Sequence, residues 1–163
     1  MERQSFITER LVIRPTNADD TSFILELLNT EGWLKFIGNK NVSNKEEALQ
    51  YIDKIDRNTN IHYWSVCLKH NLDAIGLITF IKRDYLPHND IGFAFLPGYA
   101  GKGYAMEAAS KLMEFLQERK NIHPILATSL PGNESSINLL HKLGLKFQKN
   151  MVVANQDVLL YSS

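Results

Sequence analysis

The apolar positions of this chain recur with two periods, and each period predicts one kind of secondary structure. Alternating or short apolar runs, typical of strands, cover residues 10–14, 61–68, 74–81, 89–96, 123–130, 145–153 and 156–162. Apolar residues spaced three and four positions apart, as in helices, predict one helix carrying Phe23, Ile24, Leu27 and Leu28, and further helices within residues 43–56, 102–119 and 132–144. This order of elements predicts a mixed α/β protein with no internal repeat and no linker.

Composition and charge narrow the classes of function. The chain has 163 residues, with 18 Lys and Arg against 18 Asp and Glu. This neutral balance gives no electrostatic reason to expect a nucleic-acid partner. No apolar run approaches the length of a membrane span, and the N-terminal residues lack the apolar core of a signal peptide. Because Cys67 is the single cysteine, no internal disulfide is possible. We therefore expect a cytoplasmic protein with neither a nucleic-acid nor a membrane partner.

The segment "GYAGKGYAMEAASKLMEF" at residues 98–115 carries the main candidate chemistry. Gly98, Gly101 and Gly103 follow a predicted strand and directly precede a predicted helix. Glycines let a loop backbone approach a ligand, and the first turn of a helix offers unpaired N–H groups and a positive dipole end. The segment therefore fits a phosphate cradle, to which Lys102 adds a charge. A tight structural turn explains the same glycines equally well.

Two familiar phosphate-binding motifs disagree with this segment in detail. A Walker loop requires Lys and Ser or Thr after its second glycine, whereas Tyr104 and Ala105 follow Gly103 here. The absence of that pair also disfavours an NTPase or a related switch. A dinucleotide-binding fold places its glycines in the first strand–helix unit, whereas this loop follows four predicted strands.

Four segments resemble the GCN5-related N-acetyltransferases (GNAT), in particular the branch that acetylates the N-termini of ribosomal proteins. They are "TERLVIRPTNADD", "DIGFAFLPGYAGKGYAMEAASKLMEF", "PGNESSINLLHKLGLKF" and "QDVLLYS", and they occur in the family's order over nearly the whole chain. The resemblance implies one N-acetyltransferase domain over residues 1–163. It also implies a central, mixed but mostly antiparallel, twisted sheet of about seven strands flanked by about four helices.

The resemblance implies that acetyl-CoA is the cosubstrate and indicates where it binds. The family's Q/R-x-x-G-x-G/A loop, whose backbone amides hold the CoA pyrophosphate, maps onto Ala100, Gly101, Lys102, Gly103, Tyr104 and Ala105. Ala100 replaces the usual Gln or Arg, which removes a side-chain contact. The backbone of the preceding strand is expected to pair with the pantetheine arm through Phe93, Ala94 and Phe95, as an added strand would.

The start of the last helix is expected to approach the CoA arm through Asn133 and Ser136, while Lys142 is placed to reach a phosphate. Asn133 fits a plain N-cap equally well, and Lys142 also fits a solvated helix position. The relatives' Tyr that protonates the leaving thiolate corresponds to Leu140 here, so the resemblance supplies no general acid.

Transfer to an amine requires a group that accepts its proton. Many relatives use a carboxylate on the strand before the loop, so the resemblance makes Asp90 the candidate catalytic base. Strand alternation places Asp90 on one face with Gly92 and Ala94, whose small side chains leave room for a ligand. A surface aspartate at a strand start is the competing interpretation. An ordinary aspartate, with a pKa near about 3.9, is a weak base at neutral pH, so this role requires desolvation or a relay water.

The resemblance places the acceptor site near Trp33, Phe36, Tyr85 and His88, and packing is the competing interpretation of the aromatic residues. None of the five histidines has metal-ligand spacing with its neighbours. The resemblance therefore implies an acetyl-CoA-dependent N-acetyltransferase, and the histidine spacing predicts no metal. It moves an acetyl group to a primary amine, a protein N-terminus or a small amine, by direct attack in a ternary complex. A CoA-binding module of the same fold without turnover is the alternative. Either a monomer or a homodimer fits.

Overall fold

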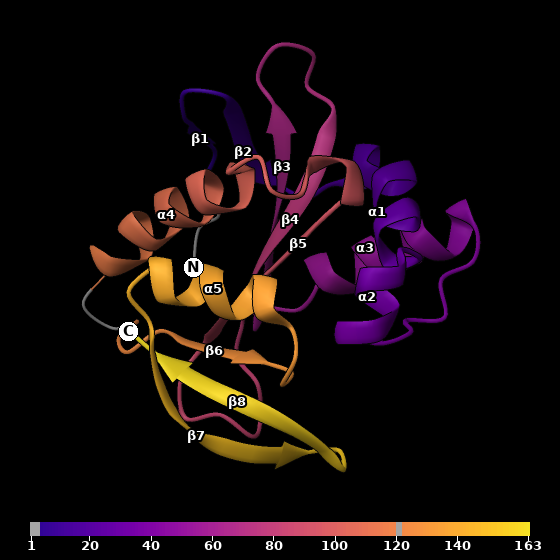
Figure 1. Ribbon diagram of the computed structural model, residues 1–163. Coiled ribbons are helices and arrows are strands. Elements are labelled where there is room, and N and C mark those ends of the chain that lie inside the picture. Colours follow the sequence, from indigo (N-terminus) through magenta and orange to yellow (C-terminus); the bar gives the residue numbers. More distant parts are fainter. Residues whose placement is uncertain (1–3, 120–121) are drawn as a thin grey trace.

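Within residues 4–119 and 122–163, which the computed structural model describes, eight strands form one sheet (Figure 1). The strands are β1 (Phe6–Ile7), β2 (Leu11–Pro15), β3 (Ile61–Leu68), β4 (Ala74–Ile81), β5 (Asp90–Phe95), β6 (Leu126–Ser129), β7 (Lys146–Val153) and β8 (Gln156–Ser162). Their spatial order is β1-β2-β3-β4-β5-β6-β8-β7. Every neighbouring pair is antiparallel except β5 and β6, which are parallel. The predicted mixed and mostly antiparallel α/β sheet is therefore confirmed.

The helices cover both faces of the sheet (Figure 1). They are α1 (Thr21–Leu28), α2 (Glu31–Phe36), α3 (Lys45–Asp56), α4 (Tyr104–Gln117) and α5 (Glu134–Lys142), with short 3-10 turns at Ala18–Asp20 and Pro97–Tyr99. One core lies between the sheet and α4 with α5, and a second lies between the opposite face and α1 to α3. The two-residue period of β3 and β4 supplies both, since Trp64 and Ile78 enter the first core and Tyr63 and Leu77 the second.

The described residues form one strand and one helix more than the approximately seven strands and four helices that the sequence predicts. The additional elements are β1 and α2. β1 has two residues, too few to show an alternation, and it is defined by its pairing with β2, where Phe6 lies opposite Ile13. α2 has six residues, of which only Trp33 is buried. A helix of fewer than two turns cannot repeat an apolar position often enough to be recognised from its period.

The connection from β5 to β6 positions the candidate site. Parallel neighbours need a crossover, and here α4 provides it. The glycine-containing loop therefore lies between the C-terminal end of β5 and the first turn of α4. β6 then returns beside β5 in the middle of the sheet, with β8 on its other side.

Candidate active site

β5 and β6 separate after a single pair of residues, which leaves an opening in the sheet. On one side, β5 pairs with β4 along its whole length, from Asp90 opposite Ile81 to Phe95 opposite Gly76. On the other side, β5 pairs with β6 at one position, where Asp90 lies opposite Leu126. The β6-facing edge of β5 beyond Asp90 therefore keeps backbone N–H and C=O groups that can pair with an extended ligand.

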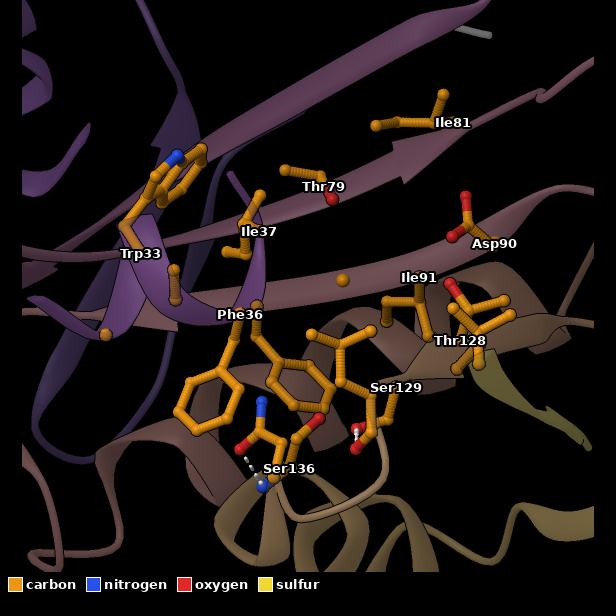
Figure 2. A pocket seen from close by; sticks show the side chains of 18 of the residues that line it. Trp33, Phe36, Ile37, Thr79, Ile81, Asp90, Ile91, Thr128, Ser129 and Ser136 are labelled. Atoms are coloured by element: carbon orange, nitrogen blue, oxygen red, sulfur yellow. Dashed lines mark hydrogen bonds between the residues drawn. The ribbon is translucent and has the colours of Figure 1, made fainter. Parts of the chain in front are cut away.

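A cavity of about 510 Å³ occupies this opening. Its wall comes from α2 and the residues after it, β3, β4 and the connection that follows β4, β5, β6, the start of α5 and the turn between β7 and β8. Figure 2 looks into it, with Trp33 and Ile37 on one side and Thr128 on the other. The chain thus brings segments from several parts of the sequence to one concave site of a size that suits a small ligand.

All six residues of β5 line the cavity, but its two faces pack differently. Ile91, Phe93 and Phe95 contact the core beneath α4, whereas Ala94 contacts the core beneath α1 to α3. A Cβ atom on Gly92 would lie 2.8 Å from Thr79 Oγ1, so the Thr79 side chain leaves no room for a larger residue there. The small size of Gly92 is therefore required by Thr79 as well as compatible with a ligand.

Asp90 lies at the closed end of the opening and is 2% exposed. Both of its carboxylate oxygens accept from Arg83 Nε, at 2.8 and 2.9 Å. Burial raises the pKa of Asp90, and this effect outweighs the opposing effect of the Arg83 charge and hydrogen bond. The desolvation that a basic role for Asp90 requires is present, together with an ion pair that the sequence pattern offered no reason to expect.

The loop before α4 leaves six consecutive backbone amides unused. None of the N–H groups of residues 101–106 donates to another described residue; the first α4 bond runs from Glu107 N to Gly103 O at 3.0 Å. Gly101 and Gly103 have φ of +73° and +81°, a region that favours glycine. The amides at the start of α4 face outward along its positive dipole end, as an anion site requires.

A buttress built from Thr8, Arg10 and Glu107 ties this loop to the β1–β2 turn. Glu107, in the first turn of α4, accepts from Thr8 Oγ1 at 2.6 Å and from Arg10 Nε at 2.7 Å. Arg10 Nη1 also donates to the carbonyl of Lys102 at 3.0 Å, and its guanidinium lies 4.4 Å from the centre of the Tyr104 ring. Burial would raise the pKa of Glu107, but the hydrogen bonds from Thr8 and Arg10 lower it overall.

The start of α5 forms the opposite lip of the cavity. Asn133 is the N-cap, since its Oδ1 accepts from Ser136 N at 3.3 Å, and both residues line the cavity. The cap uses only the oxygen, so the side-chain NH₂ of Asn133 donates to no other described residue. Leu140, at the position of the relatives' Tyr, is 1% exposed and belongs to the core, and it also borders the cavity.

The structure places most, but not all, of the predicted site residues at the cavity. Trp33, Phe36 and Tyr85 line it, whereas His88 does not. Lys142 is exposed at the far end of α5, away from the Asn133 lip. Residues 100–105 lie beyond the cavity, on the loop that follows the Phe95 end of β5.

Comparisons with known proteins agree with this arrangement. The family model described as an acetyltransferase (GNAT) domain matches residues 10–146. The chain belongs to the GNAT acetyltransferase family. A Bacillus subtilis protein named uncharacterized N-acetyltransferase YnaD is 32% identical over 139 residues, covering 85% of this chain and 81% of its own. The enzyme class that the sequence predicts, an N-acetyltransferase, is thereby confirmed.

Solved GNAT structures share the fold. The ribosomal-protein-S5-alanine acetyltransferase from Vibrio fischeri superposes with a TM-score of 0.81 at 21% identity, covering 98% of this chain and 95% of that one. Spermidine N-acetyltransferase from Vibrio cholerae, solved with CoA and spermine, gives 0.81 at 18% identity, covering 96% of each chain. The predicted resemblance to GNAT enzymes, including ribosomal-protein acetyltransferases, is confirmed at the level of family and fold.

Sequence reasoning missed several polar residues that line the cavity of this GNAT chain. They are Lys40, Thr79, Arg83, Thr128, Ser129 and Gln156. Arg83 and Lys40 lie in connecting segments, where neither period nor motif marks them. Their convergence with Asp90 depends on how three distant segments pack, and a single sequence carries no signal for that.

Within the described ranges, no three His, Cys, Asp or Glu side chains come together in a group that could hold a metal ion. None of the helices in these ranges is long and apolar enough to cross a membrane.

Cys67 is fully buried in β3, and burial raises the pKa of its thiol. A nucleophilic role for Cys67 therefore has no support in its surroundings.

Proposed function

We propose that this GNAT chain transfers an acetyl group from acetyl-CoA to a primary amine by direct attack in a ternary complex. The observation that carries the proposal is the opening beside β5, where the strand loses β6 as a partner after Asp90. This opening runs from a buried carboxylate at one end to the α4 loop at the other. Acetyl-CoA has the shape and chemistry to occupy it, because its thioester lies at the end of an extended arm that leads to a diphosphate.

The loop at residues 100–105 holds the pyrophosphate in this proposal. The unpaired amides supply donors, the α4 dipole supplies a favourable potential, and the two left-handed glycines keep the approach clear. The carbonyl of Lys102 is engaged by Arg10, so this oxygen is held by a cation of the protein. Lys102 adds an exposed positive charge beside the loop. Lys142 contacts a phosphate only if the bound ligand extends along α5.

The free edge of β5 holds the pantetheine arm through the backbone of Phe93, Ala94 and Phe95. An arm that carries amide groups can pair with such an edge as an added strand does. The unused NH₂ of Asn133 is placed at the opposite lip to donate to the same arm. In this way the thioester carbon is directed toward the Asp90 end of the cavity.

Asp90 accepts the amine proton, directly or through a water, in the proposed reaction. The amine nitrogen forms a bond to the thioester carbon, the carbon–sulfur bond breaks, and the thiolate leaves with the electron pair and takes a proton from solvent. Burial prepares Asp90 for this role because it raises the pKa of the carboxyl above that of an ordinary aspartate. Trp33, Phe36 and Tyr85 border the space where the acceptor enters.

Two measurements test the proposal in sequence. Calorimetry with CoA and acetyl-CoA is expected to show binding, and both ligands are expected to raise the melting temperature by mass action. A thiol-release assay with a library of peptides and small amines then identifies an acceptor. Absence of CoA binding at millimolar concentration would refute the proposal. Binding without thiol release on any amine would favour a CoA-binding module that does not turn over.

A further inference from the structure

The Asp90 end of the cavity has more positive than negative charge. Three side chains that are charged at neutral pH line the cavity: Lys40, Arg83 and Asp90. The carboxylate is already engaged by Arg83, so one full positive charge remains without a counterpart in the wall. A cavity built to receive a simple polycation would carry the opposite excess.

Arg83 uses only part of its guanidinium to bind Asp90. The ion pair runs through Nε, at 2.8 and 2.9 Å from the two oxygens. The four remaining N–H groups, on the two terminal nitrogens, donate to no other described residue. Asp90 therefore fixes the orientation of the guanidinium while its terminal edge stays available, the edge that holds oxyanions in a bidentate manner.

Lys40 is the second cation and also lacks a counterion. It lines the cavity from the exposed segment after α2 and makes no ion pair or hydrogen bond with another described residue. Surrounding protein atoms lower the pKa of Lys40, and the charge of Arg83 lowers it further. An anion that binds between Arg83 and Lys40 would offset this unfavourable effect on the Lys40 ammonium.

These cations lie at the wrong end of the cavity to hold the CoA diphosphate. Arg83 contacts Asp90, the first residue of β5, whereas the phosphate loop follows Phe95, the last one. A six-residue strand separates its ends by about 17 Å at about 3.3 Å per residue. The cations therefore face the acceptor end, where the proposed reaction places the amine.

We propose that the acceptor carries an oxyanion, a carboxylate or a phosphate, close to its primary amine, and that Arg83 and Lys40 bind this oxyanion. The inference rests on the proposed acetyltransferase function. The amine lies beside Asp90 while the oxyanion takes the terminal edge of Arg83 and the Lys40 ammonium. Since Asp90 and Arg83 are in direct contact, a short spacer joins the two acceptor groups.

The test compares three matched acceptor series with one, two or three carbons between the groups. The first series is glycine, β-alanine and 4-aminobutyrate; the second has the corresponding carboxamides; the third has the corresponding aminoalkylphosphonates. We expect the best anionic acceptor to exceed its carboxamide at least tenfold in kcat/KM, and the first and third series distinguish carboxylate from phosphate. Carboxamides that react equally well or better would overturn the inference.

Two variants link the preference to these residues. Lys40→Gln is expected to reduce the ratio between anionic acceptor and carboxamide at least fivefold while CoA affinity is kept. Lys54→Gln, which removes an exposed charge on α3 away from the cavity, is the matched control and is expected to keep the ratio. An unchanged ratio in Lys40→Gln would contradict the assignment of Lys40.

If none of these amines reacts, the oxyanion site is tested by a binding measurement that needs no turnover. Propionate, butyrate and propylphosphonate, which lack the amine, are titrated into the CoA-saturated protein while the melting temperature is followed. A rise in the wild type that Lys40→Gln loses supports the oxyanion site, and no rise in the wild type overturns it. CoA calorimetry on the same samples reports separately on the proposed function.

Discussion

The α4 loop and the Asp90 end of the cavity differ in which atoms face the ligand. The loop offers main-chain amides, held by two left-handed glycines and by the buttress of Thr8, Arg10 and Glu107. The Asp90 end offers side chains from segments far apart in the sequence, with a buried ion pair at its centre. A site made of backbone tolerates changes in its side chains, whereas a site made of side chains can change its ligand through one substitution.

This difference fits a division of labour between the two ends. The GNAT family model covers residues 10–146, so the loop and two of the three buttress residues lie within it. A common cosubstrate can be held by main-chain atoms in every member, because their positions depend on glycine spacing and helix geometry. An acceptor that varies between enzymes needs side chains to recognise it. The following predictions test whether the two ends are separable in this way.

Asp90→Asn is expected to have the largest effect, and only on catalysis. General-base catalysis contributes about 10²- to 10⁴-fold, so kcat with an identified acceptor should fall by about that factor while CoA affinity stays the same. Because burial raises the pKa of Asp90, wild-type kcat should rise as pH increases through that pKa. The loss in the variant should shrink at higher pH, where more of the amine is already neutral.

The controls for this prediction are a folding check and an exposed aspartate. Asn keeps the size of Asp90 but leaves the Arg83 charge without its partner, so circular dichroism and the melting temperature must accompany the kinetics. Asp19→Asn changes an exposed carboxylate near α1 and should leave kcat unaffected. Near wild-type kcat of Asp90→Asn across the pH range would exclude Asp90 as the base and leave positioning of a neutral amine.

Gly101→Asp is expected to have the second largest effect, this time on CoA binding. The position has φ of +73°, and a Cβ atom there would meet no other heavy atom within 4 Å, so the fold can accept a short polar side chain. A carboxylate beside the pyrophosphate repels it and opposes the α4 dipole. We expect calorimetry to give a CoA Kd at least about tenfold weaker, roughly 1.4 kcal/mol.

Gly101→Asn provides the matched control, because it has the same shape and the same backbone strain without the charge. The predicted difference is therefore between the Asp and Asn variants, not between either variant and the wild type. Equal CoA affinities of the two would mean that the loop is a turn without a phosphate. In that case the α4 loop and the Asp90 end of the cavity would not divide the ligands as proposed.

The same contrast explains how far the sequence predicts this molecule. Residues 61–68 and 74–81 are correctly predicted as strands because their apolar period is set by two cores, one on each face. The glycine loop is recognisable because positive φ restricts which residues can occupy it. Short elements such as α2 are missed, since their position is decided by one buried side chain, Trp33, and by tertiary packing.

The acceptor end is less accessible to sequence reasoning for a physical reason. Asp90 is identified from the alternation of β5, but its ion pair with Arg83 depends on the path of the segment that connects β4 to β5. Lys40 reaches the same cavity from the other side, after α2. No local pattern encodes the approach of three segments, so the net positive charge of this end becomes visible only in the folded chain.

Glu107→Gln is expected to loosen the buttress and to have a moderate effect on stability. Hydrogen bonds to charged groups contribute a few kcal/mol at most, so we expect a loss of about 1 to 2 kcal/mol in the free energy of unfolding at pH 7. Glu107→Gln should also weaken CoA binding a few-fold, because Arg10 no longer holds the loop carbonyl firmly. Chemical denaturation and calorimetry measure the two effects.

The pH dependence of this loss has a defined sign. The pKa of Glu107 is lowered in the folded protein, so its contribution to stability is present above the unfolded pKa, about 4.3, and is lost as pH falls through the folded value. The difference between wild type and Glu107→Gln should therefore shrink on acidification. Glu114→Gln, in an exposed pair with Lys111 on the same helix, should cost less than about 0.5 kcal/mol. A difference that grows toward low pH would contradict the buttress.

Lys102→Ala is expected to have the smallest effect, and it separates main-chain from side-chain binding within the loop itself. The Lys102 side chain is exposed, with its ammonium 5.6 Å from the centre of the Tyr99 ring, whereas its carbonyl bond to Arg10 is kept in the variant. An exposed charge acts on the pyrophosphate through solvent and is screened over a Debye length of about 8 Å at physiological salt. We therefore expect CoA affinity to fall by only about two- to threefold at low ionic strength, and by less as salt increases, in calorimetric titrations at two salt concentrations. A loss of CoA affinity of more than about tenfold that persists at high salt would mean that the Lys102 side chain, not the backbone amides, carries the phosphate contact. The distinction between a main-chain site at the loop and a side-chain site at the Asp90 end would then no longer hold.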